Sequence, residues 1–156
     1  MDDTNVDIAI QVFTTLAEYC QGPCTDNQFA LIRTKLCDSV NWIIKQNYSH
    51  SCNLTDESEL KVTAMTSMLS LLEGVTTPSI PRQMIHTLNF AVIVRNMRDI
   101  FTQEKEHRNI DLAFQYYHLM SALSDYDEKG DIRRQVSCLS TVSIRYFILM
   151  LKYINV

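Results

Sequence analysis

The chain is 156 residues long, enough for one domain with a buried core, and 46% of its residues are hydrophobic while 21% are charged. These values exclude an intrinsically disordered chain. The net charge of −4 excludes the basic surface that nucleic-acid binding requires, so we expect no nucleic-acid partner. Only three Gly and three Pro are present, too few for the tight turns of a β-sandwich or barrel, which favours helices.

The cysteine count and the hydropathy pattern indicate a cytosolic setting. Five cysteines, an odd number, follow an acidic N-terminus without a signal-peptide pattern, and we therefore expect reduced, unpaired thiols. The most apolar stretch, residues 147–151, is short and is flanked by Arg145 and Lys152. We expect neither a membrane span nor direct membrane contact by this segment.

Apolar residues recur at spacings of three and four, which predicts about seven helices. The first runs over residues 6–20 and ends at Gly22 and Pro23, where glycine suits a left-handed conformation and proline prevents continuation. The second begins at Thr25, which we expect to form a capping box with Gln28, and continues as one helix through residue 43. Its polar exit spans residues 47–53.

The remaining chain predicts five further helices. One starts near Thr55 or Asp56 and ends before Gly74, and the next starts at Ser79 or Ile80 with Pro81 in its first turn. The others cover residues 90–101, either continuous with the preceding helix or separate, residues 109–126, and residue 132 to the C-terminus. The helix at 109–126 is apolar on several sides and needs cover from several neighbours.

These helices predict an all-α fold of antiparallel pairs, arranged as a helical bundle or as a slice of an α-solenoid, with residues 1–156 as a single helical domain. Met65 and Met68 lie at helical spacing and are expected in the core rather than on a calmodulin-like surface. The acidic stretch 125–131 does not match an EF-hand and is expected to be a solvated linker.

No motif predicts catalysis, a cofactor or a metal site. Cys20 and Cys24 are separated by three residues and lack a second ligand pair, so structural thiols are a better interpretation than zinc ligands. The histidines lie in unrelated contexts: His50, His86, His107 and His118. A nucleophilic pair of Cys138 with His86 or His118 stays an alternative that no motif supports.

Residues 12–24 read V-F-T-T-L-A-E-Y-C-Q-G-P-C and are followed by Asn27 and Gln28. This pattern resembles the RIH-associated domain, a helical module of ryanodine receptors and inositol trisphosphate receptors. The motif that carries the resemblance comprises Glu18, Tyr19, Cys20, Gln21, Gly22, Pro23, Cys24, Asn27 and Gln28. Segments 68–74 and 80–84 are similar in the same order. The resemblance covers about residues 8–126, and the helix at 127–156 is not assigned by it.

The resemblance implies an armadillo-like α-solenoid segment of a ligand-gated calcium-release channel, on the cytosolic face of the endoplasmic or sarcoplasmic reticulum. Such a segment is not an enzyme. It transmits conformational change from ligand-sensing regions toward the pore. The implied partners are neighbouring cytosolic domains of the same channel, which is a homotetramer. Either receptor subfamily fits. The alternatives are a stand-alone helical adaptor that shares the module and, as a third class, a cysteine hydrolase.

Overall fold

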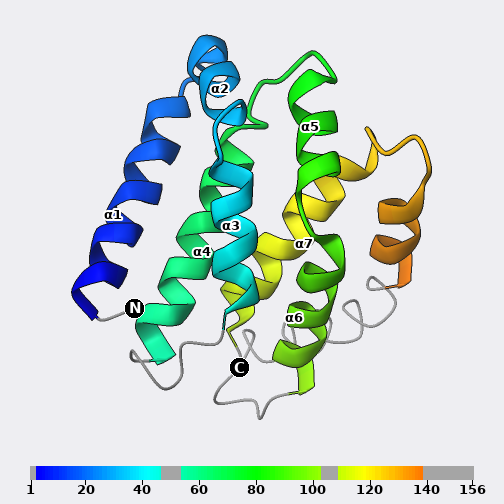
Figure 1. Ribbon diagram of the computed structural model, residues 1–156. Coiled ribbons are helices and arrows are strands. Elements are labelled where there is room, and N and C mark those ends of the chain that lie inside the picture. The colour runs from blue at the N-terminus through cyan, green and yellow to red at the C-terminus, as the bar shows by residue number, and fades with distance from the viewer. Residues whose placement is uncertain (1–2, 47–53, 103–108, 139–156) are drawn as a thin grey trace, which may run out of the picture.

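The computed structural model describes residues 3–46, 54–102 and 109–138, and within them every regular element is a helix (Figure 1). The predicted all-α class is therefore confirmed. The helices are α1 (Asp3–Cys20), α2 (Thr25–Ile32), α3 (Leu36–Lys45), α4 (Leu54–Ser70), α5 (Ser79–Thr87), α6 (Phe90–Thr102) and α7 (Ile110–Ser124). Residues 131–138 are also helical.

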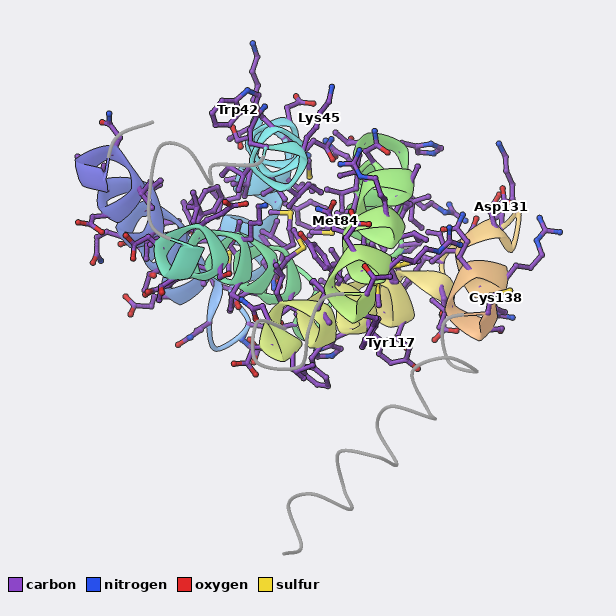
Figure 2. All side chains as sticks on the ribbon, turned by 90° about the horizontal axis from the view of Figure 1, so that it is seen from below. Trp42, Lys45, Met84, Tyr117, Asp131 and Cys138 are labelled. Carbon is purple, nitrogen blue, oxygen red and sulfur yellow. The ribbon has the colours of Figure 1, made fainter. Side chains whose placement is uncertain are left out.

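The helices form two layers. In the first layer α1, α4 and α7 run in the same direction, and α4 packs against both of the others (Figure 1). In the second layer α2 and α3 run back along the first layer, and α5 and α6 do the same beside them. The helix at 131–138 lies next to α5 and α6, and Figure 2 shows the same arrangement from below, with α3 nearly end-on. Each helix of the first layer and the chain that returns after it make up one unit: α1 with α2 and α3, α4 with α5 and α6, and α7 with the helix at 131–138. The outgoing helix is continuous in every unit, and the returning helix is broken in the first two.

A glycine marks each passage from the first layer to the second. Gly22, Gly74 and Gly130 have φ angles of 88°, 64° and 69°, which L-residues with side chains adopt only at a cost. They are all the glycines of the chain and stand 52 and 56 residues apart. The repeated layout of outgoing helix, glycine turn and returning helix is typical of an α-solenoid, the second of the two architectures expected from the sequence.

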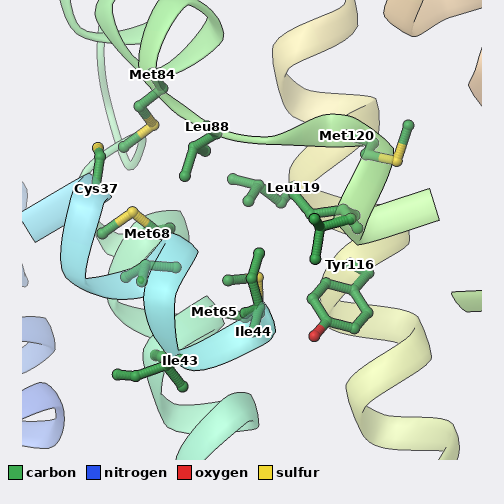
Figure 3. Close-up of a cluster of buried hydrophobic side chains, with 14 of the residues drawn as sticks. Cys37, Ile43, Ile44, Met65, Met68, Met84, Leu88, Tyr116, Leu119 and Met120 are labelled. Carbon is green, nitrogen blue, oxygen red and sulfur yellow. The ribbon is translucent and has the colours of Figure 1, made fainter. Parts of the chain in front are cut away.

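The core lies between the two layers (Figure 3). Met65 and Met68 of α4 are fully buried there, which confirms the core interpretation of this methionine pair. The side chains around them come from both layers: Cys37, Ile43, Ile44, Met84, Leu88, Tyr116, Leu119 and Met120. Helix α7 buries residues on several sides against α4, α5 and α6, as its apolar pattern predicted.

The predicted second helix is wrong in two respects. It is split, because α2 ends at Ile32 and α3 starts at Leu36. The Thr34 side chain stabilises the turn between the two helices, because its hydroxyl donates to the Leu31 carbonyl at 2.7 Å and accepts from the Leu36 amide at 3.2 Å. The predicted capping box does not form either. Residue 24 is the N-cap, without a side-chain capping bond, and the Gln28 side chain is engaged elsewhere.

Helices α5 and α6 are separate, which settles the alternative that the sequence left open. Leu88 is extended (ψ 142°), and the Asn89 side chain accepts from the Val92 amide at 3.2 Å. Asn41 of α3 bridges the break, since its side chain donates to the Thr87 carbonyl and accepts from the Asn89 amide, both at 2.8 Å. The second layer is thus tied together where its returning helix breaks.

The acidic stretch after α7 has a structural role that the sequence interpretation missed. The carboxylate of Asp127 accepts from the Ile132 amide at 2.7 Å and from the Lys129 amide at 3.2 Å, so it caps the helix at 131–138. The rest of the predicted last helix, the polar exit at 47–53, Cys52, His50 and His107 lie outside the described residues.

Candidate functional site: two interlocked turns

The sequence motif forms the turn between α1 and α2. The Gln21 amide donates to the Glu18 carbonyl at 3.1 Å, and the Cys24 amide donates to the Cys20 carbonyl at the same distance. Gly22 takes the left-handed conformation predicted for it, with open space where a side chain would lie. Glycine is therefore required at position 22 by the backbone conformation and not by a lack of space for a side chain.

Pro23 brings this turn against the next one. A Cβ atom built on Gly74 would lie 2.5 Å from Pro23 Cγ and 2.8 Å from Pro23 Cβ, closer than atoms of real side chains approach. The proline ring thus rests directly on the glycine backbone of the turn that follows α4. Two adjacent units of the solenoid are in contact through their turns, and the absence of a side chain at Gly74 makes the contact possible.

Gln28 fastens the same two units. Its side chain is 1% exposed, and its amide nitrogen donates to the Ser70 carbonyl at 3.0 Å and to the Glu73 carbonyl at 2.8 Å. The Ser70 carbonyl belongs to the last residue of α4, where the carbonyls of a helix lack partners within it, and the Glu73 carbonyl lies in the turn that follows. Gln28 supplies the missing donor from the neighbouring unit.

Among the other motif residues, Asn27 makes a hydrogen bond between neighbouring helices, and several are exposed. The Asn27 side chain donates to the Tyr19 carbonyl at 2.8 Å and joins the end of α1 to α2. Glu18 and Gln21 are exposed, and Tyr19 is 57% exposed although it is aromatic. The structure therefore brings Pro23 and Gln28 together at the contact with the next unit, and leaves Glu18, Tyr19 and Gln21 facing outward.

The two cysteines of the motif are free thiols, Cys20 fully buried and Cys24 partly buried. Burial raises the pKa of Cys20, and the neighbouring Cys24 raises it further. The thiolate is the reactive form of cysteine and the form that binds metals, so Cys20 is held in its unreactive state at neutral pH. Within the described residues no group of three His, Cys, Asp or Glu side chains is placed to hold a metal ion.

A second polar cluster lies at the opposite end of α4 and was not predicted. Glu57 and Lys61 form a buried ion pair at 2.5 Å, each side chain 9% exposed, and the Lys61 ammonium also donates to the Gln46 carbonyl at 2.9 Å. The sequence signal was the i, i+4 spacing of Glu and Lys, which occurs on many exposed helices and carries no sign of burial. The pair joins α4 to the end of α3.

Nearby, the Asn96 side chain of α6 donates to the Ile44 carbonyl at 2.6 Å and lies 3.3 Å from the Tyr116 hydroxyl. Burial raises the pKa of Tyr116 to about 12, against a smaller opposite effect of the Asn96 contact. The tyrosine stays protonated and joins α7 to this cluster. Both ends of the second layer are therefore fixed by polar groups, with the apolar core between them.

A cavity of about 490 Å³ lies between the returning helix of the second unit and the helix at 131–138. Its lining combines two cations, three carboxylates and His86 with apolar side chains, and Arg82 pairs with Glu128 across it at 2.5 Å. His118 rests against the Phe114 ring on α7, with centroids 5.8 Å apart. Cys138 does not line this cavity, so the structure does not place it with His86 there.

Residues 1–44 match a family model described as RyR and IP3R Homology associated. The matched stretch contains α1, α2 and nearly all of α3, and it includes the whole turn motif. The resemblance inferred from the sequence is confirmed for this stretch. Separately, no helix of the described chain combines the length and apolarity needed to cross a membrane.

Proposed function

We propose that this chain is a non-catalytic helical module of a ryanodine or inositol trisphosphate receptor type of calcium-release channel, and that it transmits conformational change toward the pore. The observation that carries the proposal is the match of residues 1–44 to a family defined by those receptors. The fold supports it, because stacked helical units form extended, quasi-one-dimensional scaffolds rather than closed catalytic pockets.

The interlocked turns give the proposed transmission a physical route. A displacement applied to α1 or α2 reaches α4 through Gln28, whose two hydrogen bonds end on the carbonyl of Ser70, the last residue of α4, and on the carbonyl of Glu73 in the turn that follows. It reaches the turn before α5 through Pro23, which rests on Gly74. The Gln28 side chain is buried, and a buried, close-packed side chain moves together with its surroundings, because interiors resist compression. The first two units therefore move as one rigid body rather than as two parts joined by a hinge.

The same proposal assigns the setting and the partners. The module works on the cytosolic face of the endoplasmic or sarcoplasmic reticulum, and its partners are neighbouring cytosolic domains of a homotetrameric channel. The motif residues act as structural elements of this rigid body and do not bind inositol trisphosphate or Ca²⁺. No catalytic role is assigned to the module.

A stand-alone helical adaptor is the second candidate. It is favoured by the extent of the family match, which ends at residue 44 and leaves α4 to α7 outside the matched stretch. An adaptor would use the same rigid scaffold to bind another protein, without a pore in the same polypeptide.

The test uses the full-length protein from the reading frame that encodes this chain, expressed in cells that lack endogenous release channels. We expect pore-forming segments downstream and Ca²⁺ release from the reticulum on stimulation with inositol trisphosphate or Ca²⁺. Gln28→Leu should shift the half-maximal stimulus several-fold at unchanged protein level. The exposed Glu59→Ala change on α4 is the matched control. A full-length protein without membrane segments and without Ca²⁺ release would contradict the channel proposal and leave the adaptor.

A further inference from the structure

The outer face of α1 carries an apolar stripe that no described residue covers. Ile8 is 57% exposed, Val12 49% and Tyr19 57%, and they make up three of the five large hydrophobic side chains that are exposed in the described chain. At 100° per residue these three positions fall within about 40° of one another around the helix axis. They form a single line about 16 Å long, at a rise of 1.5 Å per residue.

The opposite side of α1 is the one that faces the fold. Val6, Phe13 and Ala17 are buried there, and α1 packs along α4. Figure 1 shows α1 at the edge of the first layer, beyond α4. The stripe therefore lies where a further helix of the same layer would stack, as α1 itself stacks on α4. Solenoids that end at a given helix present a polar outer face there, whereas this face exposes three large apolar side chains along its centre, with Thr15 between Val12 and Tyr19.

The charges of α1 indicate which kind of helix would bind on this face. Every charged residue in the sequence of α1 is a carboxylate: Asp3, Asp7 and Glu18. Asp7 and Glu18 are exposed and lie on one side of the stripe, about 100–120° from its centre around the helix axis. A second copy of this chain docked through the same stripe would bring these carboxylates together, and like charges in contact are unfavourable. A helix with lysine or arginine beside its apolar stripe would instead pair with them.

We propose that the outer face of α1 binds an amphipathic helix whose apolar stripe is flanked by basic residues, and that this helix continues the layer formed by α1, α4 and α7. The inference deepens the proposed function, because it names the chemistry of the neighbouring domain through which the module is moved. Apolar contact supplies the affinity, and Asp7 and Glu18 supply orientation and discrimination.

The probe is a synthetic 18-residue helical peptide with a leucine stripe and lysine flanks, and its counterpart carries glutamate in place of lysine. Each labelled peptide is titrated with the full 156-residue chain and followed by fluorescence anisotropy. We expect micromolar binding of the lysine peptide and at least about fivefold weaker binding of the glutamate peptide, from two exposed ion pairs gained or lost. The double variant Asp7→Lys/Glu18→Lys should reverse this preference.

Val12→Ser should weaken the lysine peptide about tenfold, because it removes apolar area at the middle of the stripe. Phe114→Ser is the matched control, since Phe114 is 54% exposed on α7, and it should leave the affinity unchanged. Equal affinity for both peptides, no binding of either, or an equal loss from Phe114→Ser would overturn the proposal. So would a dimer in sedimentation that Val12→Ser dissociates, because the occupant would then be a second copy. Ca²⁺ release by the full-length protein does not depend on these outcomes and tests the proposed function separately.

Discussion

Two of the contacts between neighbouring units of this solenoid, one at each pair of turns, occupy equivalent places and are built differently. Gln28 is the fourth residue of α2 and Arg82 the fourth residue of α5, and each reaches the turn of the following unit. Gln28 is buried and donates to two backbone carbonyls, whereas Arg82 pairs with Glu128 at the surface, with 52% and 75% of the two side chains exposed. The same layout supports a rigid contact in one case and a weak one in the other.

The two contacts differ in the kind of interaction that forms them. The first contact depends on shape, because Pro23 fits only against a residue without a side chain and Gln28 fits only where two carbonyls converge. The second depends on charge in a solvated position, where ion pairs contribute little. Because α7 itself is buried in the core, we expect only the turn after α7 and the helix at 131–138 to separate more readily than the first two units separate from each other.

The largest effect is expected from Gly74→Ala. The new Cβ would meet the Pro23 ring and would also occupy a left-handed conformation, so we expect a loss of about 3 kcal/mol in the free energy of unfolding. Gly130→Ala is the matched control in the third unit. It has a similar φ of 69° but open space around it, and it should cost about 1 kcal/mol. Urea unfolding followed by far-ultraviolet circular dichroism measures both, and equal losses would mean that the two turns are not in contact.

Gln28→Leu comes next. It fills the same space but removes the donor to the Ser70 and Glu73 carbonyls, and we expect a loss of about 2 kcal/mol. Asn27→Ala on the same helix removes an exposed hydrogen bond and should cost no more than about 1 kcal/mol. If the two variants unfold at the same urea concentration, the buried position of Gln28 adds nothing to the contact.

Alkaline pH tests the core of the first unit. Burial, aided by Asp38, raises the pKa of Cys37 to about 11 from 9.0. The folded state thus holds a proton that the unfolded state releases, so this stabilisation is complete below pH 9 and is lost as the pH rises through 9 toward 11. Between pH 8 and pH 10.5 the wild type should lose about 2 kcal/mol more than Cys37→Ala. Parallel pH profiles for the two proteins would show that Cys37 titrates normally when folded.

Arg82→Ala should have the smallest effect, under about 0.5 kcal/mol, because both partners of the Arg82–Glu128 pair are solvated. Raising the salt concentration to 1 M should abolish even this difference. A loss as large as that of Gln28→Leu would remove the contrast between the two contacts.

Local signals in the sequence predicted much of this fold. The positive φ of Gly22 followed from a helix that stops before a proline, and the burial of Met65 and Met68 followed from helical spacing. Each of these features is decided by residues within a turn or two. The helix start at Thr25, and the start at Ser79 as one of two adjacent positions, were predicted for the same reason.

Contacts between distant segments were not predicted. Gln28 was expected to cap its own helix, but its partners lie 42 and 45 residues away, and no local pattern indicates them. The break at Thr34 was missed because the apolar spacing continues across it from α2 into α3. One signal was available for the solenoid: the three glycines stand 52 and 56 residues apart, each at a turn between layers. Their spacing gives the period of the units.

The central claim is that Pro23 and Gly74 lock the first two units together, and a double-mutant cycle between these residues tests it most directly. Gly74→Ala is measured in the wild type and in a Pro23→Gly background, where the ring that opposes the new Cβ is gone and other effects of Pro23→Gly cancel. We predict a loss of about 3 kcal/mol in the first background and about 1 kcal/mol in the second, a coupling of about 2 kcal/mol. Equal losses in both backgrounds, and hence no coupling, would contradict the interlock.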